Sequence, residues 1–89
     1  MVQNTNNNLK EKLDKFIGKT VFIVQDGFLK NKYSINKLKF VIEYEILNIT
    51  DEETQNYLKI NLNQIYKTEI NKQNIILYLD NDTIIYLNI

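Results

Sequence analysis

The chain has 89 residues, of which 11 are lysine and 11 are acidic, so its formal net charge is zero. Histidine, cysteine, arginine, proline, tryptophan and alanine do not occur, which excludes disulfides, thiol chemistry and zinc sites of the usual ligands. At this length we expect one small domain, and no apolar run approaches the roughly 20 residues that span a bilayer.

Gln3 to Asn8 is polar and does not fit a signal peptide, and we expect residues 1–7 to form a disordered lead. Asn8 is a predicted N-cap, and Glu11 completes a capping box. The pattern predicts a helix over 9–17, with Gly18 as its natural stop. One apolar stripe runs along this helix, formed by Leu9, Leu13, Phe16 and Ile17.

From Lys19 onward the hydrophobic period changes to two, which indicates strands. Thr20 to Gln25 is β-branched and aromatic and precedes the turn pair Asp26–Gly27. Phe28 to Asn36 fits a short strand or an extended loop. From Leu38 to Ile46, apolar residues alternate with largely charged ones, which predicts one strand with a single apolar face.

Tyr57 to Ile70 starts as a strand, but its alternation changes phase, which predicts a bulge or short break near Asn63–Gln64. The segments Ile75 to Leu79 and Thr83 to Ile89 form a predicted hairpin joined by residues 80–82. Together the elements predict an α+β, mainly β domain over residues 8–89. A short N-terminal helix packs on a strongly bent or barrel-like antiparallel sheet of about five or six strands.

The C-terminal hairpin is apolar on both faces when Leu79 is paired with Ile84. Its second face then carries Tyr78, Ile85 and Leu87, which one short helix cannot cover. Soluble monomers rarely expose apolar patches of more than several hundred Å². We therefore expect these three residues to form a homodimer contact or a hydrophobic docking surface for a partner.

The charges are unevenly distributed, with a balance of +5 over residues 1–39 and −5 over residues 40–89. A basic segment surrounds Tyr33 with Lys30, Lys32, Lys37 and Lys39, which is typical of a nucleic-acid-binding strand with one stacking ring. The alternative is an edge strand protected from aggregation by lysines. An acidic cluster follows, formed by Glu43, Glu45, Asp51, Glu52 and Glu53. It suits docking to a basic partner, and it equally suits the solvated face of a strand and its loop.

Catalytic signals are lacking, since Ser34 is the only serine and no histidine is present to activate it. The run Asp80–Asp82 starts like a calcium loop, but Ile84 occupies the next ligand position and no glycine follows. With only Gly18 and Gly27 there is no glycine-rich phosphate loop. We expect no enzyme, no cofactor and no metal site.

Two short stretches resemble known families. After the predicted helix, Ile17-Gly18-Lys19-Thr20-Val21 followed by Asp26-Gly27 resembles the opening of Sm-like small barrels, although the characteristic Sm sequence for RNA binding is not visible. Leu58 to Leu87 is similar to the tail of pleckstrin-homology-like and LytTR-type β domains. Each covers a third of the chain or less, and neither assigns a family.

The lack of catalytic and metal-ligating residue types therefore favours a small, non-enzymatic, cytoplasmic binding protein that acts on another protein. Its asparagine, isoleucine and lysine bias is typical of AT-rich codons, which suggests an inhibitor or regulator from a phage or other mobile element of a low-GC genome. The alternative is an Sm-like or SH3-like small barrel that binds nucleic acid through the segment from Lys30 to Lys39.

Overall fold

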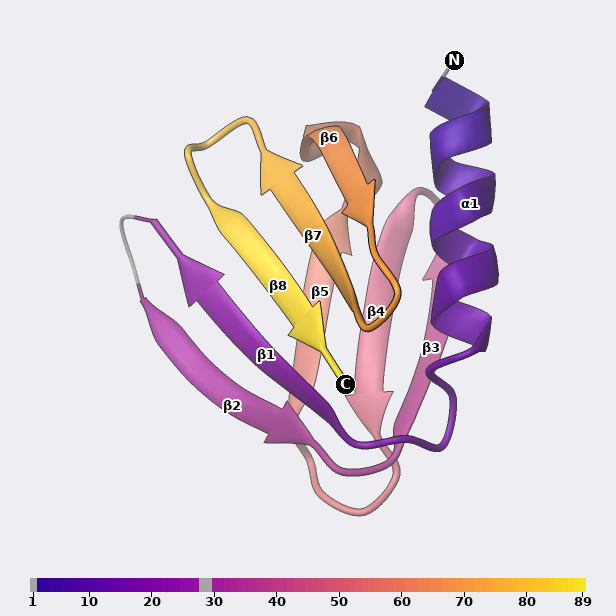
Figure 1. The fold of residues 1–89 in the computed structure, drawn as a ribbon, viewed down its shortest axis with the longest axis vertical. Coiled ribbons are helices and arrows are strands. Elements are labelled where there is room, and N and C mark those ends of the chain that lie inside the picture. The colour runs from indigo at the N-terminus through magenta and orange to yellow at the C-terminus, as the bar shows by residue number, and fades with distance from the viewer. Residues whose placement is uncertain (1, 28–29) are drawn as a thin grey trace.

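A computed structural model describes residues 2–27 and 30–89, with side chains from Asn8 onward. Within these residues the chain forms one α-helix, one 3-10 turn and eight strands (Figure 1). Their order is α1 (Val2–Asp14), β1 (Val21–Asp26), β2 (Asn31–Ile35), β3 (Leu38–Glu43), β4 (Ile46–Asp51), β5 (Tyr57–Asn61), η1 (Leu62–Gln64), β6 (Ile65–Ile70), β7 (Asn74–Leu79) and β8 (Ile84–Asn88). The predicted mainly β class with an N-terminal helix is confirmed.

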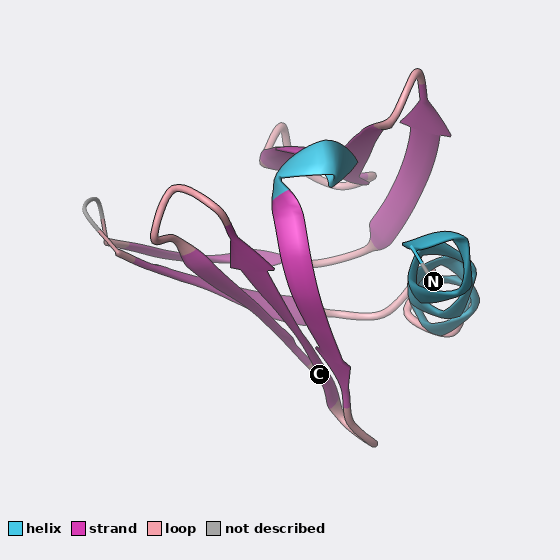
Figure 2. Cartoon of the chain, turned by 90° about the horizontal axis from the view of Figure 1, so that it is seen from above, coloured by secondary structure: helices cyan, strands magenta, loops and turns pink. Residues whose placement is uncertain are grey.

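The strands make two antiparallel sheets that pack together without closing into a barrel. The larger sheet has the order β2-β1-β8-β7-β6 and the smaller one the order β3-β4-β5. α1 lies where the two sheets part, as its end-on view in Figure 2 shows. On one side Lys12 Nζ donates to the carbonyl of Lys72 beyond β6 at 2.9 Å. The helix thus lies at the opening between edge strands β3 and β6 and packs against β6.

The core lies between the two sheets and the helix and consists of inward-facing aliphatic side chains with one phenylalanine. The predicted helical stripe supplies three of its buried members, and alternate positions of the strands supply the rest, as periods of 3.6 and two require. The buried apolar residues are Leu9, Leu13, Phe16, Val21, Ile23, Ile35, Leu38, Leu47, Ile49, Leu58, Ile60, Leu62, Ile75, Leu77, Leu79, Ile85 and Leu87.

The helix differs from the prediction at both ends. It begins at Val2 rather than at Leu9, because a helix anchored by buried residues extends at little further cost. Met1 lies outside the described residues. It ends at Asp14, after which 15–17 continue as tighter turns with hydrogen bonds to the third residue back. This tightening turns Ile17 outward, so it is exposed although it was predicted to be buried. No helix in the described part of the chain has the length and apolar character needed to span a bilayer.

The described residues form eight strands rather than five or six, mainly because two predicted strands are divided. The run from Leu38 to Ile46 is interrupted by Tyr44 and Glu45, which both have positive φ (51° and 64°) and form a two-residue hairpin turn. Neither residue type signals such a turn. The break predicted near Asn63–Gln64 is confirmed by η1 and by the register shift that follows it in β6.

The segment predicted as a short strand or an extended loop contains β2. Its first two residues, Phe28 and Leu29, lie outside the described residues. β2 pairs with β1 in the register Val24 with Lys32, so these two strands form a hairpin after the turn signal at Asp26–Gly27.

The C-terminal hairpin is present, but its register differs from the prediction by one residue. Tyr78 pairs with Ile84, and the Leu79 N–H donates to the Thr83 carbonyl at 2.9 Å. The turn therefore has three residues and ends in Asp82, whose φ of 64° is left-handed. Because side chains alternate along a strand, a shift of one residue exchanges the two faces of β8.

Candidate functional site: the outer face of the five-stranded sheet

The five-stranded sheet turns an apolar face away from the core. We call its central six residues the outer patch: Phe22, Val24, Ile76, Tyr78, Ile84 and Tyr86. They come from three neighbouring strands, β1, β8 and β7, and all face opposite to the buried residues between them. Phe22 is 57% exposed, and the other five are half-buried because they lie against one another on the sheet surface. No described element covers this face.

One cross-strand row of the outer face has a basic residue at one end and an acidic residue at the other. Reading across the sheet, Lys32 on β2 pairs with Val24, which pairs with Tyr86. Tyr86 pairs with Ile76, and Ile76 pairs with Glu69 on β6. The row therefore carries opposite charges on its two margins and three apolar side chains between them.

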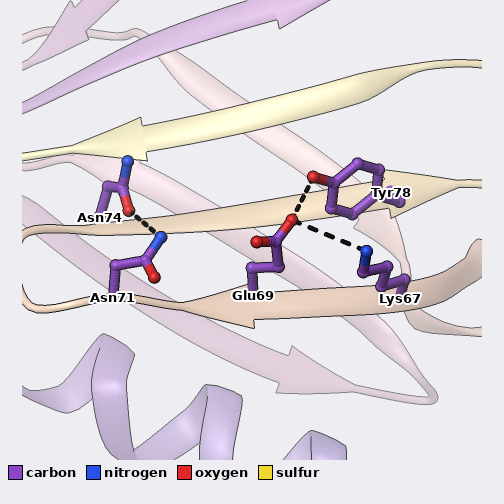
Figure 3. Close-up of polar contacts among 5 residues, drawn as sticks. All are labelled: Lys67, Glu69, Asn71, Asn74 and Tyr78. Atoms are coloured by element: carbon purple, nitrogen blue, oxygen red, sulfur yellow. Dashed lines mark hydrogen bonds and ion pairs between the residues drawn. The ribbon is translucent and has the colours of Figure 1, made fainter.

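Tyr78 is held in place by polar contacts at the β6 margin (Figure 3). Its hydroxyl donates to the Glu69 carboxylate, and Lys67 Nζ lies 4.9 Å from the centre of its ring. Lys67 also forms an ion pair with Glu69 at 3.9 Å, and the Tyr66 ring packs 6.2 Å away. The hydrogen bond to Glu69, followed by desolvation, raises the pKa of Tyr78 to about 12. The result is a fixed aromatic side chain of the type that anchors protein interfaces.

Asparagines close one end of the outer face. Asn71 Nδ2 donates to Asn74 Oδ1 at 2.7 Å across the β6–β7 turn (Figure 3). Asn74 in turn donates to Asn88 at 3.2 Å, and Asn88 donates to the Phe22 carbonyl at 3.4 Å. These bonds join the β6–β7 turn to strands β7, β8 and β1 at a polar boundary of the outer patch.

Of the residues predicted for self-association, the structure leaves only Tyr78 on the outer face. Ile85 is 3% exposed and Leu87 0% exposed, and both belong to the core. The predicted pairing of Leu79 with Ile84 leaves four residues between the paired positions, one more than in the structure, so it assigned these side chains to the wrong face. Ile84 and Tyr86 take the outer positions in their place.

The lysine and tyrosine segment is divided between two sheets rather than gathered into one surface. Lys32 lies on the outer face of the five-stranded sheet, while Lys39 projects from β3 of the other sheet and Lys37 lies in the turn between them. Lys30 pairs with Asp26 at 3.9 Å. Tyr33 faces the core side opposite Ile23 and donates to the Tyr57 carbonyl at 3.4 Å.

Burial, and then the neighbouring Tyr57, raise the pKa of Tyr33 above its ordinary value. Its ring is half-buried against the core and is not the exposed stacking ring that the segment predicted.

The acidic residues lie at opposite ends of β4. Glu43 and Glu45 are exposed at the β3–β4 turn, whereas Glu52 and Glu53 are exposed in the β4–β5 loop. Six residues of β4 separate the two groups, a distance of about 20 Å along the strand. The sequence cluster therefore does not form one acidic surface.

Asp51, the fifth acidic residue, is buried and fastens the loop between β2 and β3 to the loop after β4. Its carboxylate accepts from the N–H groups of Asn36 (2.8 Å), Lys37 (3.1 Å) and Glu53 (2.9 Å), and from Thr54 Oγ1 (2.8 Å). Desolvation raises the pKa of this carboxyl, but the four hydrogen bonds outweigh it and hold the pKa well below its usual range. Asp51 is a structural residue, and the other four acids of the cluster are exposed.

Sequence reasoning missed four members of the outer patch. Phe22 and Val24 belong to an unbroken apolar run, in which alternation does not say which residues face outward. Ile84 and Tyr86 were hidden by the one-residue register difference. No family model matches the chain, and no curated protein or solved structure matches it either.

Proposed function

We propose that the protein is a non-enzymatic binding protein that acts through a protein–protein contact on the outer patch. The observation that carries the proposal is an apolar, aromatic sheet face that no described element covers, with the fixed ring of Tyr78 at its margin. An uncovered patch of this kind marks an interaction surface. The absence of histidine and cysteine from the sequence supports binding rather than catalysis.

The occupant that fits the outer patch is a second copy of the chain. A two-fold axis parallel to β8 through Tyr86 would place Lys32 of one copy over Glu69 of the other, because these residues end the same cross-strand row. The apolar centres then face each other, as in an isologous interface. Opposite charges at the margins fix the register of such a pair.

The test is the molar mass in solution, measured by light scattering after size-exclusion chromatography. The wild-type protein is expected to have a dimer mass that falls on dilution, and Ile84→Lys is expected to be a folded monomer. Val41→Lys is the matched control, because it adds the same charge at an exposed aliphatic residue of the other sheet. Lys32→Glu should weaken the dimer at low salt, and adding Glu69→Lys should restore it.

A wild-type protein that remains monomeric at 1 mM would refute the second copy as occupant. An Ile84→Lys protein that keeps the dimer mass would refute the outer patch as the contact. A gel shift with single-stranded RNA or DNA that weakens steeply with salt would instead favour nucleic-acid binding. The division of the lysines between two sheets speaks against that alternative.

A further inference from the structure

A groove runs between α1 and the free edge of β3. It has a volume of about 580 Å³, with Lys10 and Asp14 on the helix side and Phe40, Val41 and Ile42 on the strand side. Phe40 and Ile42 project from the inner face of β3 and Val41 from its outer face. Side chains of both faces meet only at a strand edge, so the groove follows the edge of β3 itself.

On the side that lines this groove, β3 has no neighbouring strand in the part of the chain that the structure describes. Glu43 and Ile46 flank a two-residue turn, so the N–H and C=O groups of Lys39, Val41 and Glu43 point toward β4, and those at alternate positions point away. Leu38 follows this rule on the free side, since its carbonyl accepts from Gly18 at 2.8 Å and its N–H donates to Lys19 at 3.1 Å.

Beyond Leu38, the outward groups of Phe40 and Ile42 have no hydrogen-bond partner among the described residues. Two N–H donors and two C=O acceptors on this edge are therefore available to a partner. At Leu38 the same edge already forms hydrogen bonds with Gly18 and Lys19. Such a row is the template to which an extended peptide adds as a further strand.

The charges around the groove favour a basic occupant. Asp14 and Glu45 line it together with a single lysine, Lys10. Glu43 lies two positions beyond Val41 on the same exposed face of β3 and Lys39 two positions before it, so three acidic residues surround the groove against two lysines. Two of the acidic residues singled out in the sequence thus lie where an incoming strand would pass.

We propose that the groove between α1 and β3 binds an extended segment of another protein that carries lysine or arginine. The segment adds a strand to β3 through the backbone of Phe40 and Ile42, and its basic side chains face Asp14, Glu43 and Glu45. This site lies on the smaller sheet and does not depend on the outer patch.

The test uses amide hydrogen exchange and a six-residue capped peptide of alternating lysine and valine. In the free protein the Phe40 and Ile42 amides are expected to exchange fast and those of Lys39 and Val41 slowly. The peptide is expected to slow exchange at Phe40 and Ile42 at least tenfold. The same peptide with N-methyl groups on alternate residues, which removes its donors, is the matched control and is expected to leave exchange unchanged.

Charge is tested with Asp14→Lys, which sits at the helix C-terminus, where a cation is favourable and the fold is preserved. It is expected to lower the peptide affinity about fivefold at low salt, while Glu52→Lys, an exposed acid outside the groove, has no effect. Phe40 and Ile42 amides that are slow in the free protein, or unchanged by millimolar peptide, would overturn the proposal. Repeating the titration on Ile84→Lys separates this outcome from that of the dimer.

Discussion

The register of the C-terminal hairpin decides which residues of β8 support the fold, and two neighbouring isoleucines test it. Ile85 is buried in the core, whereas Ile84 lies on the outer face. Truncating a fully buried isoleucine to alanine costs about 3 kcal/mol of unfolding free energy, from lost transfer energy plus a cavity. In a domain of this size that lowers the melting temperature by roughly 12–24 °C. Ile84→Ala removes the same atoms from a half-exposed position and should cost about 1 kcal/mol.

The assay is urea unfolding at low micromolar protein, where association contributes least. It is followed by circular dichroism and by tyrosine fluorescence, because the chain has no tryptophan. The comparison is internal, since both variants make the same chemical change on the same strand. If Ile84→Ala destabilises the protein as much as Ile85→Ala, or more, the register that pairs Tyr78 with Ile84 is wrong. The sequence-based pairing of Leu79 with Ile84 would then be correct.

Three further predictions concern single side chains. The pKa of Asp51 in the folded protein lies below its ordinary value of 3.8. The ionised carboxylate therefore stabilises the fold above pH 3.8, and this stabilisation is lost as the pH falls through the folded pKa. Asp51→Asn should lower the melting temperature at pH 7 and flatten the acid side of a stability–pH curve. The raised pKa of Tyr78 gives the opposite pH dependence, because stability is lost as the pH rises from about 10 toward about 12. Absorbance titration of the Glu69→Gln variant should show the Tyr78 hydroxyl ionising at lower pH than in the wild type. Tyr44 is 95% exposed with φ 51°, so Tyr44→Asn should raise the unfolding free energy by about 0.5–1 kcal/mol in urea; a loss of stability would show that the ring makes a contact.

Local periodicity predicted those parts of the fold in which one face alone is apolar. Leu9, Leu13 and Phe16 recur at helical spacing, and all three are buried. In β5 the alternation of Leu58 and Ile60 with polar residues likewise gives the buried face correctly. In such segments the burial of one set of side chains leaves a single reasonable orientation.

Where both faces are apolar, the pattern cannot choose between them. In β7 and β8 the choice depends on whether three or four residues form the turn, which is decided by the left-handed conformation of Asp82. The turn at Tyr44 and Glu45 is similar, since tertiary pairing of β3 with β4 imposes a conformation that neither residue prefers. These are effects of the whole fold on a few backbone angles.

The candidate surfaces were harder to predict than the strands, because neighbours in sequence are not neighbours on the surface. The chain crosses from one sheet to the other between Ile35 and Leu38, which separates Lys32 from Lys39. Conversely, Lys32 and Glu69 share a cross-strand row although they are distant in sequence. Only the strand order β2-β1-β8-β7-β6 reveals that relation.

The central position of β8 in the larger sheet affects how the protein folds during synthesis. β8 joins β1 to β7, and a hydrogen bond from Asn88 to Phe22 spans 66 residues of sequence. The chain loses the entropy of closing this long loop before the contacts of β8 can stabilise it, and this slows folding. During synthesis β1 and β2 leave the ribosome long before β8. Until β8 pairs with it, the edge of β1 opposite β2 stays exposed and can pair with other chains. Expression yield should therefore respond strongly to changes in β8, and folding should complete only after this strand has left the ribosome.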